Sequence, residues 1–461
     1  MYCMRVAVIF FIVLAMAAVA AGDGAVESWV SSEDGLNKLT PGESIALRKV
    51  PRRIRGDVIT VDANKTFQSI LGLGASLEHA TCYNLSRLSP VLRDEVIERL
   101  VHPEKGIGMN LMRLCIGAAD FIGEPYYSYN DLPPGETDPE LKNFSIEKDR
   151  AYVLPIIKKV QEVNPDLLFF ASPWSPPGWM KDSGTVCGGA LKREYYGVYA
   201  QYLIKYLEAY QAEGVPIYAL TLQNEPRMEH PGYPTCLWTG EEQRDFIRDY
   251  FGPMLAQSPL SPHIWCWDHN WNLRGFPRTV LVDPEAAKYV EGTAFHHYEG
   301  RVDAQSALRQ EFPDKHIYFT EGSTFRTIGA IRIINILRHW SRSYNAWVIM
   351  LDEHRKPNNG PHAAGATCVE LKDDLSVEYR FDYYMYGQFM KFIPRGSVRI
   401  ESSEPERFFA HVAFKTPDGA IVLVVANAGS ADRPFTVRCG DTSFAAVLAP
   451  KSVATYRWRL E

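Results

Sequence analysis

Short apolar runs alternate with helix-like stretches over most of the chain. In the stretches between the runs, apolar residues recur every three to four positions, as they do on one face of a helix. Most of the runs are continuously apolar, which is typical of parallel strands covered on both faces. The pattern predicts an α/β fold, a (β/α)8 TIM barrel. Its candidate strands are Ile70–Ala75, Leu111–Ile116, Leu167–Ala171, Ile217–Leu222, Ile264–Trp267, Thr293–His297, Ile317–Thr320 and Ala346–Leu351.

The pattern changes after about residue 395. Residues 395–461 hold short runs of partly alternating apolar and polar residues, separated by turns such as Pro417-Asp418-Gly419. This is typical of an antiparallel all-β sandwich. We expect the barrel over residues 65–394 and the sandwich over residues 395–461. Residues 21–64 are expected to add one or more strands to the sandwich, with Val58–Val61 as the clearest candidate. Helices are expected over Arg93–Val101, Arg150–Val163, Glu194–Glu213 and Gly240–Leu255.

The first residues have the composition of an export signal. Arg5 precedes an apolar run over Val6–Ala20, and Ala18-Val19-Ala20 is a small-residue cleavage site. The run is short for a membrane span. We expect residues 1–20 to be a signal peptide and the mature protein to be secreted or extracytoplasmic. An uncleaved membrane anchor is the alternative.

Charge and cysteine content bear on which partners, disulfides and metal sites are expected. The formal net charge of −6 disfavours a nucleic-acid partner. Of the eight cysteines, Cys3 would leave with the signal, so an odd number remains. Cys187 and Cys236 both follow predicted strands on one face of the barrel and are suggested as a disulfide, although a sequence does not fix the pairing. The chain has no Cys-x-x-Cys or His-Glu-x-x-His run, so no metal site and no cofactor are predicted.

Two glutamates stand where predicted strands give way to loops. Glu225 follows the run that begins at Ile217, and Glu321 ends the run that begins at Ile317. Two carboxylates at the C-terminal ends of barrel strands suit the cleavage of a glycosidic bond, which needs a proton donor and a stabiliser for the oxocarbenium-like centre. Asn224 suits a contact with a sugar 2-hydroxyl. The structural alternative is a helix start with Asn224 as N-cap and Pro226 at the first helical position.

Several segments resemble the motifs of one enzyme family. The chain resembles the glucosylceramidase-type members of glycoside hydrolase family 30 over almost its whole mature length. The segments that carry the resemblance are Gly72-Leu73-Gly74-Ala75, Arg113 with Asp120, Ser172-Pro173-Trp174-Ser175-Pro176-Pro177-Gly178-Trp179-Met180-Lys181, Gln223-Asn224-Glu225-Pro226, His296-His297-Tyr298, Phe319-Thr320-Glu321-Gly322 and Lys391-Phe392-Ile393-Pro394.

The resemblance implies a retaining β-glycosidase. Glu225 would act first as general acid and then as base, and Glu321 would be the nucleophile. Asp120 and Trp174 would hold the non-reducing sugar, and Arg113 would lie beneath the site and keep nearby carboxylates ionised. Proton transfer by Glu225 is expected to need a raised pKa while Glu321 is free.

Other candidates come with structural alternatives. His296 ends a strand beside Tyr298, which is placed to orient Glu321, and Trp347 is expected as a sugar platform rather than core. Arg113 is as well explained by a structural ion pair as by a ligand role. His269 and Asn270 follow the fifth strand and could line the cleft. The chain departs from the family pattern at Glu78-His79, His297 and Asp352.

The sugar and the leaving group are less well specified than the chemistry. The leading hypothesis is glucosylceramidase-like hydrolysis of a β-glucoside, with a carbohydrate or glycolipid substrate. A glycolipid would also imply transient contact with a membrane surface. A β-glycanase or β-xylosidase acting on polysaccharide fragments is the main alternative. A non-catalytic carbohydrate-binding protein and a transglycosylase on the same scaffold stay open.

Overall fold

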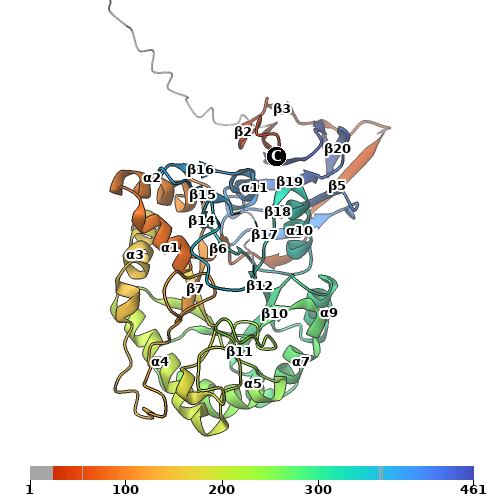
Figure 1. Cartoon of the computed structure of the whole chain (residues 1–461). Coiled ribbons are helices and arrows are strands. Elements are labelled where there is room, and N and C mark those ends of the chain that lie inside the picture. Colours follow the sequence, from red (N-terminus) through yellow and green to blue (C-terminus); the bar gives the residue numbers. More distant parts are fainter. Residues whose placement is uncertain (1–23, 54–55, 363–364, 366, 461) are drawn as a thin grey trace, which may run out of the picture.

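The structure is a computed structural model that describes residues 24–53, 56–362, 365 and 367–460. The predicted signal peptide, residues 1–20, lies outside this part of the chain. A barrel with helices around it forms one half of the molecule, and a sheet built from both ends of the chain lies beside it (Figure 1). The predicted fold class is confirmed.

Eight strands form the barrel wall. Six are parallel neighbours in the order β12-β11-β10-β9-β8-β7, and β13 pairs in parallel with β6. Single backbone bridges, Ser76 with Arg113 and Ile317 with Ser341, join this pair to β7 and to β12 and close the barrel. The bounds are β6 Gly72–Ala75, β7 Leu111–Ile116, β8 Leu168–Pro173, β9 Ile217–Thr221, β10 His263–Asn270, β11 Val290–His296, β12 His316–Glu321 and β13 Ser343–Ala346.

The interior of the barrel is packed and not open. One apolar layer takes a residue from most of the strands, among them Phe170, Trp265 and Tyr318. Trp265 and Tyr318 stack with ring centroids 3.9 Å apart. This filling is typical of eight-stranded parallel barrels. A site can therefore form at the ends of the strands but not inside the barrel.

Helices surround the barrel, and local signals explain where some of them begin. Helix α5 starts with a capping box, in which Thr239 accepts from the Glu242 amide and the Glu242 carboxylate accepts from the Thr239 amide. The bounds are α1 His79–Arg87, α2 Pro90–Val101, α3 Val153–Val163, α4 Tyr196–Ala212, α5 Gly240–Phe246, α6 Gly252–Gln257, α7 Gly275–Leu281, α8 Pro284–Ala287, α9 Asp303–Glu311, α10 Arg326–Arg338 and α11 Phe381–Met390. None of the helices in the described residues is long and apolar enough to cross a membrane.

The second sheet joins the two ends of the chain. Strand β5 pairs with β17 on one side and with β20 on the other, so Val58–Val61 lies inside this sheet. The β5–β20 pairing is parallel, whereas the sequence pattern predicted an antiparallel sandwich. The bounds are β1 Ala25–Ser32, β2 Thr40–Pro41, β3 Ile45–Ala46, β4 Arg48–Lys49, β5 Asp57–Ser69, β17 Val398–Ser402, β18 Phe409–Lys415, β19 Ile421–Asn427, β20 Arg433–Cys439, β21 Thr442–Leu448 and β22 Ser452–Trp458.

Two expectations need correction. The predicted eighth strand, Ala346–Leu351, straddles two elements, because β13 ends at Ala346 and β14 (Met350–Asp352) belongs to a separate small sheet with β15 (Val369–Leu371) and β16 (Val377–Tyr379). The disulfide between Cys187 and Cys236 is absent, since both thiols are free. The backbone of Cys187 pairs with Pro234 instead, and the buried thiol of Cys236 lies 3.8 Å from the Leu237 carbonyl oxygen.

Candidate active site

Both predicted glutamates face one cavity at the C-terminal end of the barrel. Glu321 is the last residue of β12, and Glu225 lies in the loop after β9. They line a cavity of about 310 Å³. Nδ1 of His296 lies 3.1 Å from Glu225 Oε1 and 3.9 Å from Glu321 Oε1. One imidazole therefore spans the gap between the two carboxyl groups.

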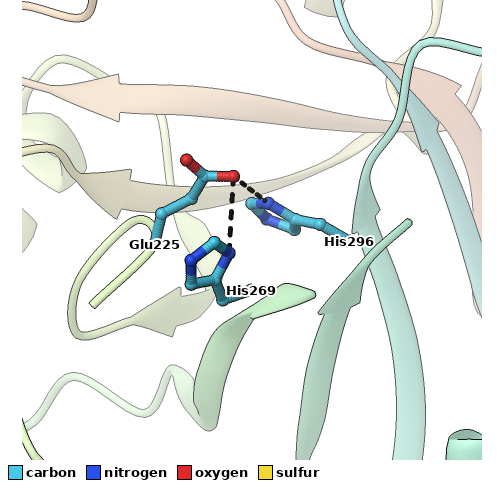
Figure 2. Close-up of side chains that lie close together, drawn as sticks. All are labelled: Glu225, His269 and His296. Atoms are coloured by element: carbon cyan, nitrogen blue, oxygen red, sulfur yellow. Dashed lines mark hydrogen bonds and ion pairs between the residues drawn. The ribbon is translucent and has the colours of Figure 1, made fainter. Parts of the chain in front are cut away.

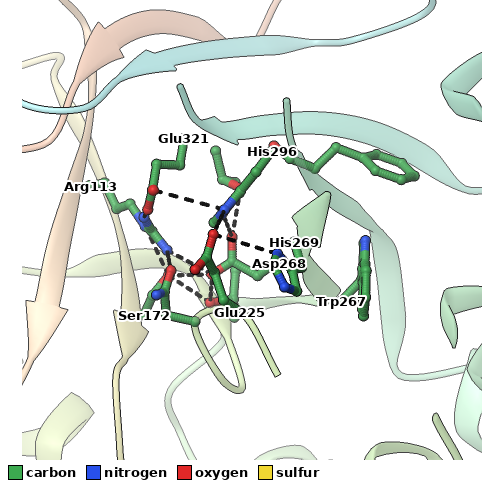
Figure 3. A network of polar contacts seen from close by, with 12 residues as sticks. Arg113, Ser172, Glu225, Trp267, Asp268, His269, His296 and Glu321 are labelled. Carbon is green, nitrogen blue, oxygen red and sulfur yellow. Dashed lines mark hydrogen bonds and ion pairs between the residues drawn. The ribbon is translucent and has the colours of Figure 1, made fainter. Parts of the chain in front are cut away.

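Arg113 lies beneath the cavity at the centre of a polar network (Figure 3). Its guanidinium donates to Glu321, to Asn224 Oδ1 at 2.7 Å and to Asp268 Oδ2 at 2.8 Å. Its Nε donates to Ser172 Oγ at 3.1 Å. The side chain is fully buried, so this positive charge is compensated by carboxylates rather than by water.

Asp268, near the end of β10, is the second centre of the network, and it was not among the predicted residues. Its carboxylate accepts from Arg113, His296, Ser172, and from Thr221 and Thr320, the last two at 2.6 Å. Burial opposes its ionisation, but Arg113 and the hydrogen bond from His296 outweigh burial and lower the pKa of Asp268 well below its usual range. Asp268 stays an anion and holds the Arg113 guanidinium and the His296 ring in place.

The surroundings of His296 favour its protonated form. Burial disfavours the imidazolium, but the Glu321 charge and the hydrogen bonds with Asp268 and Glu225 raise the pKa of His296 to about 9. Its Nε2 lies 3.0 Å from Asp268 Oδ1, which sets the orientation of the ring. The other nitrogen can therefore donate to Glu225.

The pKa of Glu225 is shifted opposite to the prediction. Burial raises it, but the imidazole of His269 and the hydrogen bond from His296 outweigh burial, and the pKa of Glu225 is lowered (Figure 2). Nδ1 of His269 lies 3.5 Å from Glu225 Oε1. The expected raised pKa rested on what proton transfer needs while Glu321 is free, whereas in the structure His269, His296 and Arg113 together favour the charged form of Glu225.

Asp120 is a buried carboxylate with an unused acceptor. Burial raises the pKa of Asp120 to about 8, and the nearby charge of Glu321 adds to this shift. Its Oδ1 is buried and has no hydrogen-bond partner among the described residues. Because an unsatisfied buried oxygen is costly, this atom is suited to a hydroxyl group of a ligand.

Aromatic side chains form one wall of the cavity. Trp174 and Trp347 are stacked, with centroids 5.3 Å apart and planes 25° apart. The Arg113 guanidinium lies 4.7 Å from the centre of the Trp174 ring, which fixes the ring from below. Phe121 meets Trp347 edge to face at 5.5 Å. Such a surface suits the apolar face of a sugar ring.

The predicted residues converge, in two layers. Asp120, Trp174, Asn224, Tyr298 and Trp347 line the cavity with the two glutamates, and Tyr298 donates to Glu321 Oε1 at 2.8 Å. Asn270 also lines the cavity. Arg113 and His296 lie fully buried beneath it. Sequence reasoning missed Asp268, although a carboxylate just past a predicted strand was the signal that identified the glutamates. It also missed Tyr233 and Met228, which line the cavity but do not follow a predicted strand directly.

The residues that depart from the family pattern lie outside the cavity lining. Glu78 caps helix α1 by accepting from the Thr81 amide, and burial raises its pKa to about 8. His79 contacts the hydroxyl of Tyr127 at 2.8 Å. His297 contacts the Ser323 carbonyl, and Asp352 accepts from backbone amides of its own loop.

A metal-binding arrangement can be recognised among the described residues. Glu225, His269 and His296 each offer one ligand atom within 4.8 Å of the others, and Glu353, His354 and Asp373 form a second, exposed group. Two histidines and a glutamate are a donor set that zinc accepts. Nε2 of His296 lies 3.0 Å from Asp268 Oδ1 and its Nδ1 lies 3.1 Å from Glu225 Oε1, so both ring nitrogens already contact carboxylates.

Similar proteins share this whole architecture. The model of the glycosyl hydrolase family 30 TIM-barrel domain matches residues 70–357, and that of the family 30 beta sandwich domain matches residues 396–456. Endo-1,6-beta-D-glucanase neg1 of Aspergillus fumigatus is 31% identical over 401 residues, which cover 80% of this chain and 80% of that protein. Lysosomal acid glucosylceramidase of Mus musculus is 32% identical over 459 residues, which cover 90% of this chain and 86% of that protein.

Two solved structures resemble this chain over almost its whole length. The endo-beta1,6-glucanase BT3312 superposes with a TM-score of 0.85 at 27% identity, and SrfJ from Salmonella typhimurium with 0.89 at 26% identity. Each match covers 95% of this chain and 100% of the other. With both of its domains matched, the chain belongs to glycosyl hydrolase family 30 and is a glycoside hydrolase.

Proposed function

We propose that this protein is a retaining β-glycosidase that hydrolyses β-glucosidic bonds by double displacement, with Glu321 as nucleophile and Glu225 as acid/base. The observation that carries the proposal is the placement of two carboxyl groups on one cavity, with one imidazole nitrogen 3.1 Å from Glu225 Oε1 and 3.9 Å from Glu321 Oε1. The retaining mechanism is proposed from the resemblance to family 30 glycosidases, and in it one carboxylate attacks the sugar while the other group protonates the leaving oxygen.

Two donors hold the Glu321 carboxylate in place for attack. Arg113 and the Tyr298 hydroxyl each donate to one of its carboxylate oxygens. Attack on the anomeric carbon would form a glycosyl ester and remove the negative charge of Glu321.

The Glu225–His296 pair would hold the proton that the leaving group needs. In the resting site the proton lies on His296, and it reaches the glycosidic oxygen through Glu225. Once Glu321 is esterified, the largest charge that favours the imidazolium is gone, so His296 stays neutral. Glu225 is then an anion that can take a proton from water, and hydrolysis of the ester restores the charge on Glu321. In this cycle Glu225 does not need a raised pKa, because it receives the proton from His296.

For the substrate, a β-1,6-linked glucan is our leading candidate. It is supported by the similarity to endo-1,6-beta-D-glucanases in sequence and structure. The outer lining of the cavity also includes polar residues, among them Glu299, Ser323 and His362, which suit a hydroxylated leaving group. Glucosylceramide is the second candidate, favoured by the similarity to the mouse glucosylceramidase over 90% of this chain.

A substrate panel tests the assignment. Aryl β-glucoside, β-xyloside, β-fucoside and β-galactoside, a β-1,6-glucan and fluorescent glucosylceramide would be compared with wild type, Glu225→Gln and Glu321→Gln. We expect turnover of glucosides and glucan with a β-anomeric first product, lost in Glu321→Gln. Activity confined to glucosylceramide would select the second candidate, and activity confined to another sugar would reject the glucoside proposal. Binding without turnover in wild type would favour a carbohydrate-binding protein, and transfer of the sugar to an added alcohol as main product would favour a transglycosylase.

Export is part of the proposal. It is supported by the charged flank, the apolar run and the small-residue site in residues 1–20. Expression in a secreting host, followed by N-terminal sequencing, should give a mature protein in the medium that begins close to residue 21. Protein retained in the membrane at full length would favour the anchor instead.

A further inference from the structure

A second cavity lies on the catalytic face of the barrel. It has a volume of about 460 Å³ and is formed by residues 131–137 and by residues 178–195. The first segment follows β7 and the second follows β8, and these two strands are parallel neighbours. Since the C-terminal ends of neighbouring parallel strands meet at one edge, the groove opens on the same side as the catalytic cavity. We call it the distal groove.

The aromatic side chains of the distal groove are held in place. Trp179 and Tyr195 meet edge to face at 5.1 Å, and both are half-buried. The Trp179 indole donates to Asn130 Oδ1 at 2.8 Å, which fixes the ring. Rigid aromatic surfaces bind a partner with little loss of conformational entropy. They are also the surfaces on which the apolar faces of sugar rings can pack.

Tyr126 connects the distal groove to the catalytic cavity. It lines the groove, and it also packs against the apolar cluster that contains Phe121, Trp174 and Trp347. These three residues line the catalytic cavity. The Tyr126 hydroxyl is buried and lacks a hydrogen-bond partner among the described residues. A chain of sugars that leaves the catalytic cavity on this side would meet Tyr126 first and could satisfy that hydroxyl.

The polar residues of the distal groove favour a hydroxylated ligand. Glu136 and Thr137 are exposed at its rim, and the Lys192 ammonium lies 5.8 Å from the centre of the Tyr195 ring. Lys181, by contrast, spends its donors on Ser175 and two backbone carbonyls and holds the loop together. Aromatic faces with carboxylate, hydroxyl and ammonium groups at the edge match the alternating apolar and hydroxyl surfaces of a glycan.

We infer that the distal groove is a subsite for further glucose units of a β-glucan whose scissile bond lies in the catalytic cavity. The inference rests on the proposed function, because it assigns to the same enzyme a polymeric substrate. A small glucoside would occupy the catalytic cavity alone. A longer chain would gain affinity from Tyr126, Trp179 and Tyr195.

The test compares short and long substrates. In wild type, kcat/KM on β-1,6-linked gluco-oligosaccharides should rise with chain length. Tyr195→Ala, which removes a half-buried ring of the groove, should raise KM for the longer oligomers about tenfold while KM for an aryl β-glucoside stays the same. Tyr83→Ala is the matched control, because Tyr83 is a 41% exposed tyrosine on helix α1 outside the groove, and it should change neither substrate.

Direct binding separates this inference from the proposed function. Calorimetry with Glu321→Gln, alone and combined with Tyr195→Ala or Tyr126→Phe, measures oligosaccharide affinity without turnover. Weaker binding of long oligomers in both combined variants would support the subsite. Equal affinity of long oligomers with and without Tyr195, or no gain in affinity with chain length, would overturn it even if aryl glucosides are hydrolysed. A lack of β-glucoside turnover in wild type would instead reject the proposed function, and the binding data would still decide on the groove.

Discussion

Two buried aspartates in this barrel show how a polar network serves different ends. Asp268 accepts from Arg113 and His296, which in turn contact Glu321 and Glu225. Asp149 accepts from the hydroxyls of three tyrosines, Tyr127, Tyr129 and Tyr210, at 2.5 to 2.7 Å. Both carboxylates are fully buried and fully satisfied. Only Asp268 is bonded to groups that also contact Glu225 and Glu321, the two residues whose charges would change in the proposed mechanism.

The difference suggests a way to separate stability from chemistry. The tyrosine hydroxyls around Asp149 connect the loop after β7 to helix α4, since Tyr210 lies on α4. Asp268 keeps its charged donors, Arg113 and His296, oriented, and it sets the charge that the site presents. The same substitution at the two positions should therefore affect different measurable quantities.

The largest effect is expected for Asp268→Asn. The amide cannot balance Arg113 and should lower the pKa of His296, so kcat should fall about a thousandfold. Steady-state kinetics on an aryl β-glucoside measures this effect. Because one buried partner of Arg113 is lost, unfolding by denaturant must be measured in parallel, and the value of kcat is compared only for folded protein. A kcat within about threefold of wild type would show that Asp268 is only structural.

Asp149→Asn is the matched comparison. An amide satisfies three tyrosine hydroxyls less well than a carboxylate does, and the free energy of unfolding should fall by about 2–3 kcal/mol. Asp149 does not line the catalytic cavity, so kcat of the folded enzyme should stay within twofold of wild type, about experimental error. A large loss of kcat without a loss of stability would erase the contrast between the two aspartates.

Tyr298→Phe sharpens the account of the nucleophile. The variant removes the hydroxyl that donates to Glu321 Oε1 at 2.8 Å but keeps the ring. Arg113 still contacts the other oxygen. We therefore expect kcat to fall about tenfold, which corresponds to the loss of one hydrogen bond in a partly closed site. If kcat is unchanged, Tyr298 serves as a wall of the cavity and does not orient Glu321.

The smallest effect concerns Glu78, a buried carboxyl group outside the cavity lining. Its pKa is raised from 4.5 to about 8 in the folded protein, so folding binds a proton and stability falls as pH rises between these two values. Glu78→Gln keeps an acceptor for the Thr81 amide and removes this dependence. Relative to wild type, the variant should gain about 1 kcal/mol or more between pH 5 and pH 7. Parallel stability curves for the two proteins over this range would contradict the expectation.

Particular residues show what the sequence could and could not reveal. Glu225 and Glu321 were recognised because each follows a continuous apolar run, which is a local signal. Asp268 also directly follows a predicted strand, but its role depends on residues from five other strands or strand ends, which the sequence does not bring together. The pKa of Glu225 was predicted in the wrong direction because the sequence does not show that His269 and His296 lie 3.5 Å and 3.1 Å from its Oε1.

For the fold, too, the sequence revealed local elements better than the pairing of distant segments. Seven barrel strands overlap the predicted runs by at least four residues each, because most of these runs are continuously apolar. The eighth was displaced, since the run around Trp347 and Val348 is apolar for a different reason, namely that both residues line the catalytic cavity. The parallel β5–β20 pairing joins segments from opposite ends of the chain, which periodicity cannot anticipate.

The central claim is that Glu321 attacks the sugar and forms a covalent ester. The most direct measurement is to incubate the enzyme with a 2-deoxy-2-fluoro β-glucoside that carries a good leaving group, and then to map the labelled peptide by mass spectrometry. The fluorine slows hydrolysis of the ester, so it accumulates. We predict one glycosyl group per protein, attached to Glu321, and no label in Glu321→Gln. Label on another carboxylate, or turnover with inversion at the anomeric carbon and no label, would contradict the mechanism.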